Sequence, residues 1–316
     1  MKTNDIDPSL VEYLTLHYSF PLQPKSAKSA QEIFAKVAER QELRKQQLRN
    51  YCREHVQENP PWVEKKQLKQ FLNDDSDKYI YCAVPKVAST PMRMTLLRVR
   101  NDSKLKITET SAHLPKYWSL LSQYNTEEVS ERLASYFKFL FVREPFHRLL
   151  SAYRDKFFGK NRIYTNGFRR LIVKTFRPHE VEVAGKESNN VTFTEFLTFI
   201  LNYSNALTRD GHWRQIEQLC FPCAFEYDFI GHFETLEEDA AYLLNTARLD
   251  DRVTFPTVRA SRASSDFMTY YSQVPREIIF RLGEAFRGDF EMFGYSFPGP
   301  LKSLLGNYTN AIGQQR

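Results

Sequence analysis

Glycine is scarce in this sequence, and long apolar runs are missing. The chain has 11 glycines among 316 residues, which is about half the usual share of about 7%. Any phosphate-binding loop must therefore be built with few glycines. No window of about 18 consecutive apolar residues occurs, so we expect no membrane-spanning helix. With 42% hydrophobic and 26% charged residues, the chain is neither collagen-like nor wholly disordered.

Acidic side chains are outnumbered by basic ones. Lysine and arginine total 44 against 38 aspartates and glutamates, which gives a formal net charge of +6. This excess favours an anionic partner. Charge alone leaves open whether that partner is a nucleic acid, an acidic polysaccharide, an anionic membrane or a nucleotide.

The first twenty residues do not have the pattern of a signal peptide, because Asp5, Asp7 and Glu12 interrupt the apolar stretch that one needs. On this ground we expect a soluble chain without an export signal. The cysteines indicate the opposite, since an even number permits two disulfides of an oxidising compartment, in any of three pairings. They are Cys52, Cys82, Cys220 and Cys223. Glycosylation patterns agree with the cysteines and begin at Asn101, Asn190, Asn202 and Asn307.

A long charged helix is predicted over residues 28–58, where Asn59-Pro60-Pro61 would end it. Its spaced apolar positions are Ile33, Val37, Leu48 and Tyr51. We interpret this segment as a solvated stem or a packing helix. The alternatives are a basic coiled coil or a nucleic-acid-binding helix, although no heptad repeat is sustained.

Three short apolar, β-prone runs are each followed by a turn and the start of a helix. The runs span residues 79–84, 136–142 and 227–232. We expect Thr90 as the N-cap of the first helix and Pro91 as its first residue. Pro145 should open the second helix, and Thr235 should begin a capping box in the third. This repetition predicts a parallel α/β sheet flanked by helices, with ligands at the carboxyl ends of its strands.

The loop after the first run has the side chains of a phosphate site. A strand that leads into a helix leaves the first amides of that helix unpaired, which favours an anion there. Lys86 can balance charge on a leaving phosphate, and Ser89 and Thr90 can donate hydrogen bonds to its oxygens. A Walker loop needs glycines that residues 85–90 lack, so a P-loop kinase or ATPase is disfavoured. The alternative is an ordinary turn whose lysine faces solvent.

The second junction offers another phosphate site. Arg143 stands where the second run ends, and Ser151 lies about two turns into the following helix. Two such sites on neighbouring strands fit a nucleotide that carries phosphates at both its 5′ and 3′ ends.

Several blocks of this sequence resemble those of the Golgi carbohydrate sulfotransferases, and most closely the chondroitin 4-O-sulfotransferases. YCAVPKVAST (81–90) is similar to their 5′-phosphosulfate loop, and KFLFVREPFHRLLSAYRDKF (138–157) is similar to their 3′-phosphate motif. LCFPCAFEYDFIGHFETLEED (219–239) resembles a third block, and DFEMFGYS (289–296) resembles the end of their catalytic domain. The resemblance covers about residues 78–298.

The resemblance implies a P-loop-like α/β fold whose parallel sheet is flanked by helices. Together with the predicted helix over residues 28–58, it divides the chain into an N-terminal helical stem (1–75), a sulfotransferase catalytic domain (76–300) and a C-terminal tail (301–316). It also implies 3′-phosphoadenosine-5′-phosphosulfate (PAPS) as donor co-substrate, with no metal. The residues that would hold the 5′-phosphosulfate are Lys86, Val87, Ala88, Ser89 and Thr90. Arg143 and Ser151 would hold the 3′-phosphate.

Two departures from the 4-O enzymes fall at this loop. Ser89 stands where those enzymes usually have cysteine, and Pro91-Met92-Arg93 stands where they usually have Asn-Trp-Lys. Ser89 keeps a hydrogen-bond donor and Arg93 keeps the charge, so donor binding should survive.

Sulfuryl transfer needs in-line geometry, a stabilised leaving group and a base for the attacking hydroxyl. Lys86 would supply the leaving-group charge, and a histidine is the natural base near neutral pH. We favour His113, because its segment resembles the one that carries the catalytic histidine in uronyl 2-O-sulfotransferases. His212 is the second candidate, as base or as a group that positions the sugar, because it resembles an H-W element of the 4-O enzymes. Either histidine could instead be structural.

Arg259 and Arg262 lie in a Ser/Arg-rich loop. This loop could close over the nucleotide or contact an acidic polysaccharide, or it could simply be solvated. Cys220-x-x-Cys223 has the spacing of half a zinc site, but the other two cysteines complete no standard spacing. Structural disulfides are therefore favoured over a metal site.

The sequence thus predicts a PAPS-dependent carbohydrate sulfotransferase. By resemblance, its acceptor is the 4-hydroxyl of N-acetylgalactosamine in chondroitin or dermatan, both anionic glycosaminoglycans. The alternatives are another glycan acceptor (a glucuronyl or other N-acetylgalactosamine terminus), a non-catalytic glycosaminoglycan-binding relative, and a nucleic-acid-binding protein that uses helix 28–58. The expected location is the Golgi lumen, although the N-terminal anchor of the related enzymes has no counterpart in this sequence.

Overall fold

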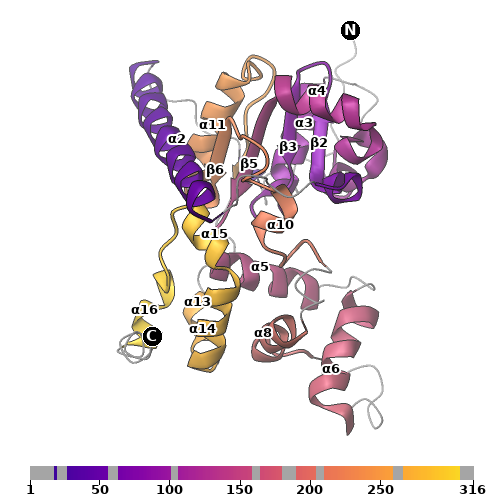
Figure 1. Cartoon of the computed structure of the whole chain (residues 1–316), viewed down its shortest axis with the longest axis vertical. Coiled ribbons are helices and arrows are strands. Elements are labelled where there is room, and N and C mark those ends of the chain that lie inside the picture. Colours follow the sequence, from indigo (N-terminus) through magenta and orange to yellow (C-terminus); the bar gives the residue numbers. More distant parts are fainter. Residues whose placement is uncertain are drawn as a thin grey trace. The chain divides into compact units, whose positions relative to one another are not determined.

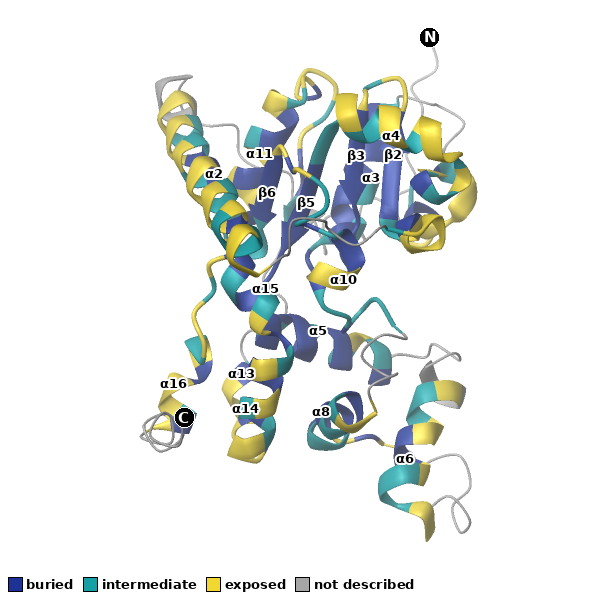
Figure 2. Cartoon of the chain, viewed as in Figure 1, coloured by how far each residue is buried: buried dark blue, intermediate teal, exposed yellow. Residues whose placement is uncertain are grey.

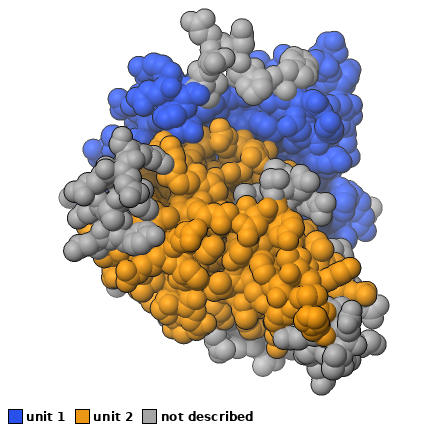
Figure 3. Space-filling model, turned by 60° about the horizontal axis from the view of Figure 1, so that its bottom comes forward, with its two compact units in different colours: residues 1–142, 220–260 blue, residues 143–219, 261–316 orange. Residues whose placement is uncertain are grey.

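The computed structural model divides the chain into two compact units. Unit 1 comprises residues 1–142 and 220–260, and unit 2 comprises residues 143–219 and 261–316 (Figures 1 and 3). The structure describes residues 18–19, 27–55, 63–100, 106–158, 164–179, 190–203, 210–258 and 266–306. The proposed domain boundaries at residues 76 and 300 stay a prediction.

Unit 1 is built on a five-stranded sheet in the order β4-β2-β3-β5-β6. Its strands are β2 (Phe71–Asp74), β3 (Tyr79–Cys82), β4 (Ser119–Leu120), β5 (Phe137–Val142) and β6 (Phe229–His232). β3, β5 and β6 run parallel and confirm the three predicted strands, whereas β2 pairs antiparallel with both β3 and β4. The sheet is therefore mixed. The carboxyl ends of β3, β5 and β6 share one edge, as the parallel pairing requires.

Helices flank this sheet, and a two-stranded sheet accompanies it. The helices and 3₁₀ turns of unit 1 are α2 (Ala27–His55), η1 (Lys65–Gln70), α3 (Ser89–Val99), η2 (Ser111–His113), η3 (Pro115–Tyr117), η4 (Leu121–Gln123), α4 (Thr126–Ser135), η6 (Phe233–Thr235) and α11 (Leu236–Thr246). β1 (Tyr18–Ser19) pairs antiparallel with β7 (Thr257–Val258). No helix among the described residues is long and apolar enough to cross a membrane.

Unit 2 is helical and packs around aromatic side chains. Its elements are α5 (Pro145–Phe157), the π-helix η5 (Tyr164–Arg169), α6 (Arg170–Phe176), α8 (Phe193–Asn202), α13 (Phe267–Tyr271), α14 (Arg276–Ala285), α15 (Arg287–Met292), η7 (Gly299–Leu301) and α16 (Lys302–Leu305). Helix α10 (Ile216–Cys220) also belongs to unit 2, except for its last residue, Cys220, with which unit 1 resumes. Phe146, Phe196, Trp213 and Tyr271 are all buried in its core. The Tyr271 hydroxyl donates to the backbone carbonyl of Phe146 at 2.8 Å, which satisfies the polar end of a buried ring.

Two details of the predicted helix starts are wrong. α3 begins at Ser89 with Ala88 as its N-cap, so Pro91 is the third helical residue rather than the first. Thr235 does stand at the N-cap of α11, but its side chain makes no capping bond. Its hydroxyl instead donates to Asp239 Oδ2 at 2.7 Å, because that buried carboxylate is the stronger acceptor. The predicted long helix is confirmed as α2 up to His55; residues 56–62, with Asn59-Pro60-Pro61, lie outside the described residues.

Helix α2 lies along β6, the last strand of the sheet (Figure 1). The side-chain amide of Gln41 pairs with both backbone groups of Ile230: Oε1 accepts from the N–H at 2.9 Å, and Nε2 donates to the carbonyl at 3.0 Å. Arg44 donates to the same carbonyl at 2.9 Å. β6 is an edge strand, so its outward backbone N–H and C=O groups have no neighbouring strand to pair with. The Gln41 side chain makes the two hydrogen bonds that such a strand would make at Ile230.

A buried carboxylate joins α2 to α11. Asp239 is fully buried and accepts from Arg44 at 2.7 Å, from Arg40 at 3.3 Å and from the His232 backbone N–H at 2.8 Å. A buried charge is tolerated when it is paired and hydrogen-bonded in this way. Figure 2 shows the result, with buried positions of α2 facing the sheet and exposed ones facing outward.

The two predicted disulfides are present within unit 1. Cys52 pairs with Cys223, and Cys82 pairs with Cys220. The first bond ties the last turn of α2 to the segment before β6, and the second ties the end of β3 to that same segment. Helix α2 is therefore linked to the sheet by a covalent bond as well as by Gln41 and Arg44.

Replacing Gln41 with leucine should lower the free energy of unfolding by about 1–3 kcal/mol, because the Ile230 N–H loses its partner in a buried place. Urea denaturation with the disulfides intact measures the change. Gln46→Leu is the matched control, since Gln46 is exposed on the same helix. Equal midpoints for the two variants would contradict the role given to Gln41.

The half-buried imidazole of His232 should make stability depend on pH. Burial, followed by the positive charges of Arg44 and Arg40, holds the pKa of His232 well below its usual value. The unfolded chain therefore binds this proton more readily than the folded one. The stability that His232 contributes is full above about pH 6.5 and is lost as the pH falls below it. Urea denaturation at pH 7, 6 and 5 should show a smaller loss for His232→Gln than for the wild type; identical pH profiles would refute this.

Candidate functional site

The loop between β3 and α3 bends sharply without glycine. Lys86 and Ala88 both adopt left-handed backbone, with φ of 72° and 66°. This conformation costs roughly 1–2 kcal/mol per residue when a Cβ is present. Left-handed residues within a turn bring successive N–H groups to one side, which makes a concavity for an anion. The chain thus forms a loop of this shape without any glycine.

The start of α3 adds further donors to the loop. The first bond of the helix runs from the Met92 N–H to the Ala88 carbonyl at 3.2 Å. The backbone N–H groups of Ser89 and Thr90 precede that first bond, so helix geometry gives them no acceptor within α3. Pro91 has no backbone N–H. With the positive end of the helix dipole at the same place, the loop favours a negative group.

His113 lies against this loop. Its Nε2 is 2.8 Å from Thr90 Oγ1, a hydrogen-bond distance between two side chains that are 23 residues apart in sequence. Unit 1 therefore brings His113 together with the loop that carries Lys86, Val87, Ala88, Ser89 and Thr90. A histidine beside an anion loop can take a proton from a hydroxyl that approaches the bound group.

The turn that carries His113 is fixed from both sides. Thr108 and Ser111 hydrogen-bond reciprocally, each backbone N–H donating to the other's hydroxyl at 2.7 and 3.0 Å. The buried Trp118 indole donates to the Ala112 carbonyl at 2.8 Å. The Arg93 guanidinium of α3 lies over the Trp118 ring, 5.6 Å from its centroid. The helix that opens at the loop thus also supports the residue that places His113.

Arg143 and Ser151 belong to unit 2. Arg143 directly follows β5 in the chain and is buried, while Ser151 is half-buried on α5. Between them, Glu144 caps α5: its Oε2 accepts from the His147 backbone N–H at 2.8 Å and contacts His147 Nδ1 at 2.8 Å. The two predicted phosphate motifs therefore fall in separate compact units.

His212, the second candidate base, also belongs to unit 2. It lies close to a carboxylate: Asp210 Oδ1 is 2.6 Å from His212 Nδ1 and accepts from the His212 backbone N–H at 2.8 Å. Arg148 holds the same turn by donating to the carbonyls of Gly211 at 2.9 Å and Arg214 at 2.7 Å. Sequence reasoning missed Asp210 and Arg148. The available signal for Asp210 was its place two residues before the histidine, whereas Arg148 had none, since Ser151 and Asp155 share its face of α5.

Buried charge continues beyond this turn. Asp289 accepts from the Ile216 N–H at 2.8 Å and from the Glu217 N–H at 3.3 Å. Burial raises the pKa of Asp289 to about 6 and lowers the pKa of Arg148 to about 10. Arg148 therefore stays charged at neutral pH, and both groups fix residues 211–217 to the helical core of unit 2.

The remaining predicted residues divide into described and undescribed ones. Arg259, Arg262, Asn101 and Asn307 lie outside the described residues, whereas Asn190 and Asn202 are exposed. Cys220 and Cys223 are used in different disulfides. Within the described ranges, no group of three or more His, Cys, Asp or Glu side chains could hold a metal ion.

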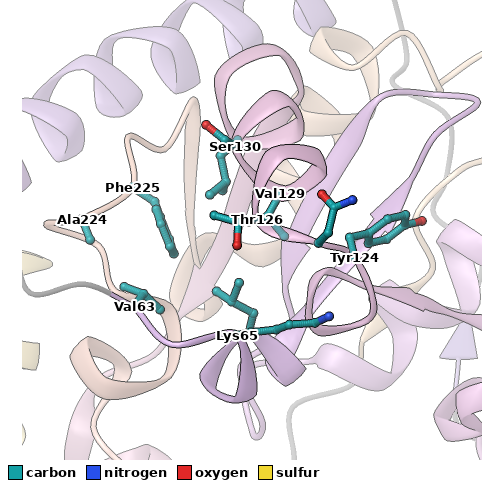
Figure 4. A pocket seen from close by; sticks show the side chains of 11 residues that line it. Val63, Lys65, Tyr124, Thr126, Val129, Ser130, Ala224 and Phe225 are labelled. Carbon is teal, nitrogen blue, oxygen red and sulfur yellow. The ribbon is translucent and has the colours of Figure 1, made fainter.

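Unit 1 also contains a pocket of about 480 Å³ (Figure 4). The side chains that line it are those of Val63, Lys65, Leu68, Tyr124, Asn125, Thr126, Val129, Ser130, Leu133, Ala224 and Phe225. None of the predicted donor-binding or catalytic residues is among them.

Comparisons with known proteins agree on one family. The profile described as "Sulfotransferase family" matches residues 69–296. Carbohydrate sulfotransferase 11 of Rattus norvegicus is 36% identical over 244 residues, which are 74% of this chain and 69% of that protein. Carbohydrate sulfotransferase 14 of Danio rerio is 33% identical over 286 residues, 86% of this chain and 76% of that protein. Carbohydrate sulfotransferase 9 of Homo sapiens is 32% identical over 275 residues, 83% of this chain and 61% of that protein. No solved structure matches the chain.

The left-handed backbone at Ala88 predicts an asymmetry between two substitutions. Ala88→Gly should change the free energy of unfolding by less than about 1 kcal/mol, because glycine adopts this φ without a Cβ clash. Ala88→Val should cost about 1–3 kcal/mol, because a β-branched side chain is strained there. Thermal or urea denaturation provides the values. Ala35→Val, exposed on α2, controls for the intrinsic change; similar stabilities for the Gly and Val variants at position 88 would rule out the strained loop.

Proposed function

Because the chain belongs to the sulfotransferase family, and within it to the carbohydrate sulfotransferases, we propose that it transfers the sulfuryl group of PAPS to the 4-hydroxyl of N-acetylgalactosamine in chondroitin or dermatan. The observation that carries this proposal is the contact between His113 and the glycine-free loop at Thr90. A single site in unit 1 then combines an anion-binding loop with a base.

The loop supplies the donor end of the reaction. We assign the 5′-phosphosulfate to Lys86, Val87, Ala88, Ser89 and Thr90, and the 3′-phosphate to Arg143 and Ser151. The Lys86 ammonium and the amides at the start of α3 stabilise the negative charge that gathers on the phosphate oxygen as its bond to sulfur breaks. Arg143 suits the 3′-phosphate because a guanidinium binds phosphate through two parallel hydrogen bonds. Arg262 is proposed as a further contact to the nucleotide.

His113 supplies the acceptor end. The acceptor oxygen attacks sulfur, a new sulfur–oxygen bond forms, and the bond from sulfur to the 5′-phosphate breaks in line with it. The hydroxyl proton passes to the His113 imidazole. The Thr90 contact supports this role, because it places the ring beside the loop that holds the reacting group.

Charge and compartment fit an anionic glycan acceptor. The net charge of +6 raises the local concentration of a polyanion around the protein. Two disulfides suit an oxidising compartment, and we place the enzyme in the Golgi lumen. The choice of chondroitin or dermatan rests on the resemblance of residues 81–90, 138–157 and 219–239 to the 4-O enzymes.

The test is transfer of labelled sulfate from PAPS to desulfated chondroitin, dermatan and heparan. Disaccharide analysis should place the label at the 4-position of N-acetylgalactosamine. His113→Ala should lower kcat by about 10²–10⁴-fold, and Lys86→Ala should lower it by about 10²–10³-fold. Both variants should keep the thermal stability of the wild type.

Two exposed residues of unit 1 provide matched controls. His55→Ala and Lys36→Ala, both on α2, remove the same groups outside the loop and should keep full activity. Labelling of heparan alone would replace the proposed acceptor. Full activity of His113→Ala would remove His113 as the base.

A further inference from the structure

The chain continues from His113 as a short exposed segment between two buried ends. Residues 113–116 (His-Leu-Pro-Lys) are all exposed, whereas Ala112 and Trp118 on either side of them are buried. The segment belongs to unit 1, as does the loop that contacts His113 at Thr90. A molecule that presents a hydroxyl to His113 therefore lies next to residues 114–116 as well.

Backbone hydrogen bonds hold this segment in two short 3₁₀ turns, η2 and η3. The Leu114 N–H donates to the Ser111 carbonyl at 3.0 Å, and the Tyr117 N–H donates to the Leu114 carbonyl at 3.1 Å. The Trp118 N–H donates to the Pro115 carbonyl at 3.0 Å. Pro115 also fixes its own φ through its ring. The exposed residues thus stand on an ordered backbone.

Arg100, at the C-cap of α3, ties the far end of the segment to the sheet. Its guanidinium donates to the Tyr117 carbonyl and pairs with Asp74, the last residue of β2, at 3.0 Å. It also lies over the Trp118 ring, 5.1 Å from the centroid. A ligand that binds a surface fixed in this way pays little entropy for ordering it.

Lys116 is the positive charge on this exposed segment. Its Nζ lies 4.9 Å from the centroid of the Tyr117 ring. Within the part of the chain that the structure describes, no carboxylate pairs with this ammonium. An aromatic face attracts a cation only weakly at an exposed place, and an ammonium has three N–H donors. Lys116 is therefore kept near the ring with donors left for an anion.

The proposed acceptor carries an anion at a matching place. Chondroitin and dermatan alternate N-acetylgalactosamine with a uronic acid, and one uronic acid is attached to O3, the oxygen next to the reacting 4-hydroxyl. A carboxylate thus accompanies that hydroxyl one sugar away. Lys116 follows His113 by three residues, which span at most about 11 Å even when fully extended. Base and ammonium are therefore close enough to contact adjacent sugars of one chain.

We propose that Lys116 binds the carboxylate of the uronic acid next to the N-acetylgalactosamine that receives the sulfuryl group. This inference rests on the proposed function and adds a residue that determines acceptor specificity. His113 takes the proton of the hydroxyl, and Lys116 fixes the neighbouring sugar of the same chain. Glycans without a carboxylate at this place bind less tightly, because the ammonium then has no charged partner to gain.

The experiment removes each partner of the contact in turn. The acceptors are desulfated chondroitin and the same polymer with its carboxyl groups reduced to hydroxymethyl groups. Lys116→Gln should raise the KM for chondroitin about five- to tenfold, because a charge-assisted hydrogen bond is lost. Its kcat and its KM for PAPS should stay within about twofold of the wild type. For the reduced polymer, wild type and Lys116→Gln should have the same KM.

Two further variants separate the contact from net charge. Lys116→Arg keeps the cation and should keep the KM for chondroitin within about twofold. Lys36→Gln removes the same charge from an exposed position on α2 and should leave the KM unchanged. An unchanged KM for chondroitin in Lys116→Gln, or an equal rise for both polymers, would overturn the proposal.

Failure of the proposed function and failure of this inference are distinguishable. If the wild type labels neither chondroitin nor dermatan, the proposed acceptor fails. Equilibrium binding of desulfated chondroitin to the full chain then gives the decision on Lys116. Binding that is weakened about five- to tenfold in Lys116→Gln, and not in Lys36→Gln, supports the contact. Equal binding by both variants, or no binding by the wild type, overturns it.

Discussion

The candidate site depends on two residues that hold left-handed backbone without being glycine. Lys86 and Ala88 keep this conformation because the strand that leads into the loop is fixed: β3 is fully buried, Cys82 is bonded to Cys220, and the Ala83 N–H donates to the Gln70 carbonyl at 3.0 Å. Strained loops persist where the surrounding structure over-determines them. The sheet and its disulfide therefore stabilise the loop that opens α3, and α3 in turn supports Trp118 and the turn of His113.

Several parts of this fold could be predicted because their signals are local. β3, β5 and β6 are short apolar runs followed by helices, and this pattern indicates parallel strands whatever the rest of the chain does. β2 could not be found in the same way, since Phe71–Asp74 is short and ends in polar residues. The start of α3 was misjudged because Thr90-Pro91 satisfies the usual rule for a helix start. The left-handed backbone at Ala88 places the helix start at Ser89 instead, and no residue in this segment is of a type that predicts left-handed backbone.

Charges were the hardest part of the sequence to interpret. Helix α2 has the composition of a solvated stem, yet Arg40 and Arg44 reach a buried Asp239, and Gln41 completes the edge of the sheet. At the candidate site, Arg148 looks like one more surface arginine of a basic protein, although it is buried against the turn of His212. Sequence gives the type of a polar residue, while its partner depends on segments 60 to 200 positions away. Long-range pairs of this kind are visible only in the folded chain.

The pairing of the cysteines sets an order of events during synthesis. Cys52 and Cys82 leave the ribosome well over a hundred residues before their partners, since the native bonds span 171 and 138 positions. During that interval each of these two thiols has only the other as a cysteine partner. They are separated by about thirty residues, which favours closure of a small, non-native disulfide ring. Both correct partners then arrive almost together, three positions apart. The native pairing is then reached from that ring by thiol–disulfide exchange. The supply of a disulfide isomerase therefore becomes a determinant of how much correctly paired protein is obtained.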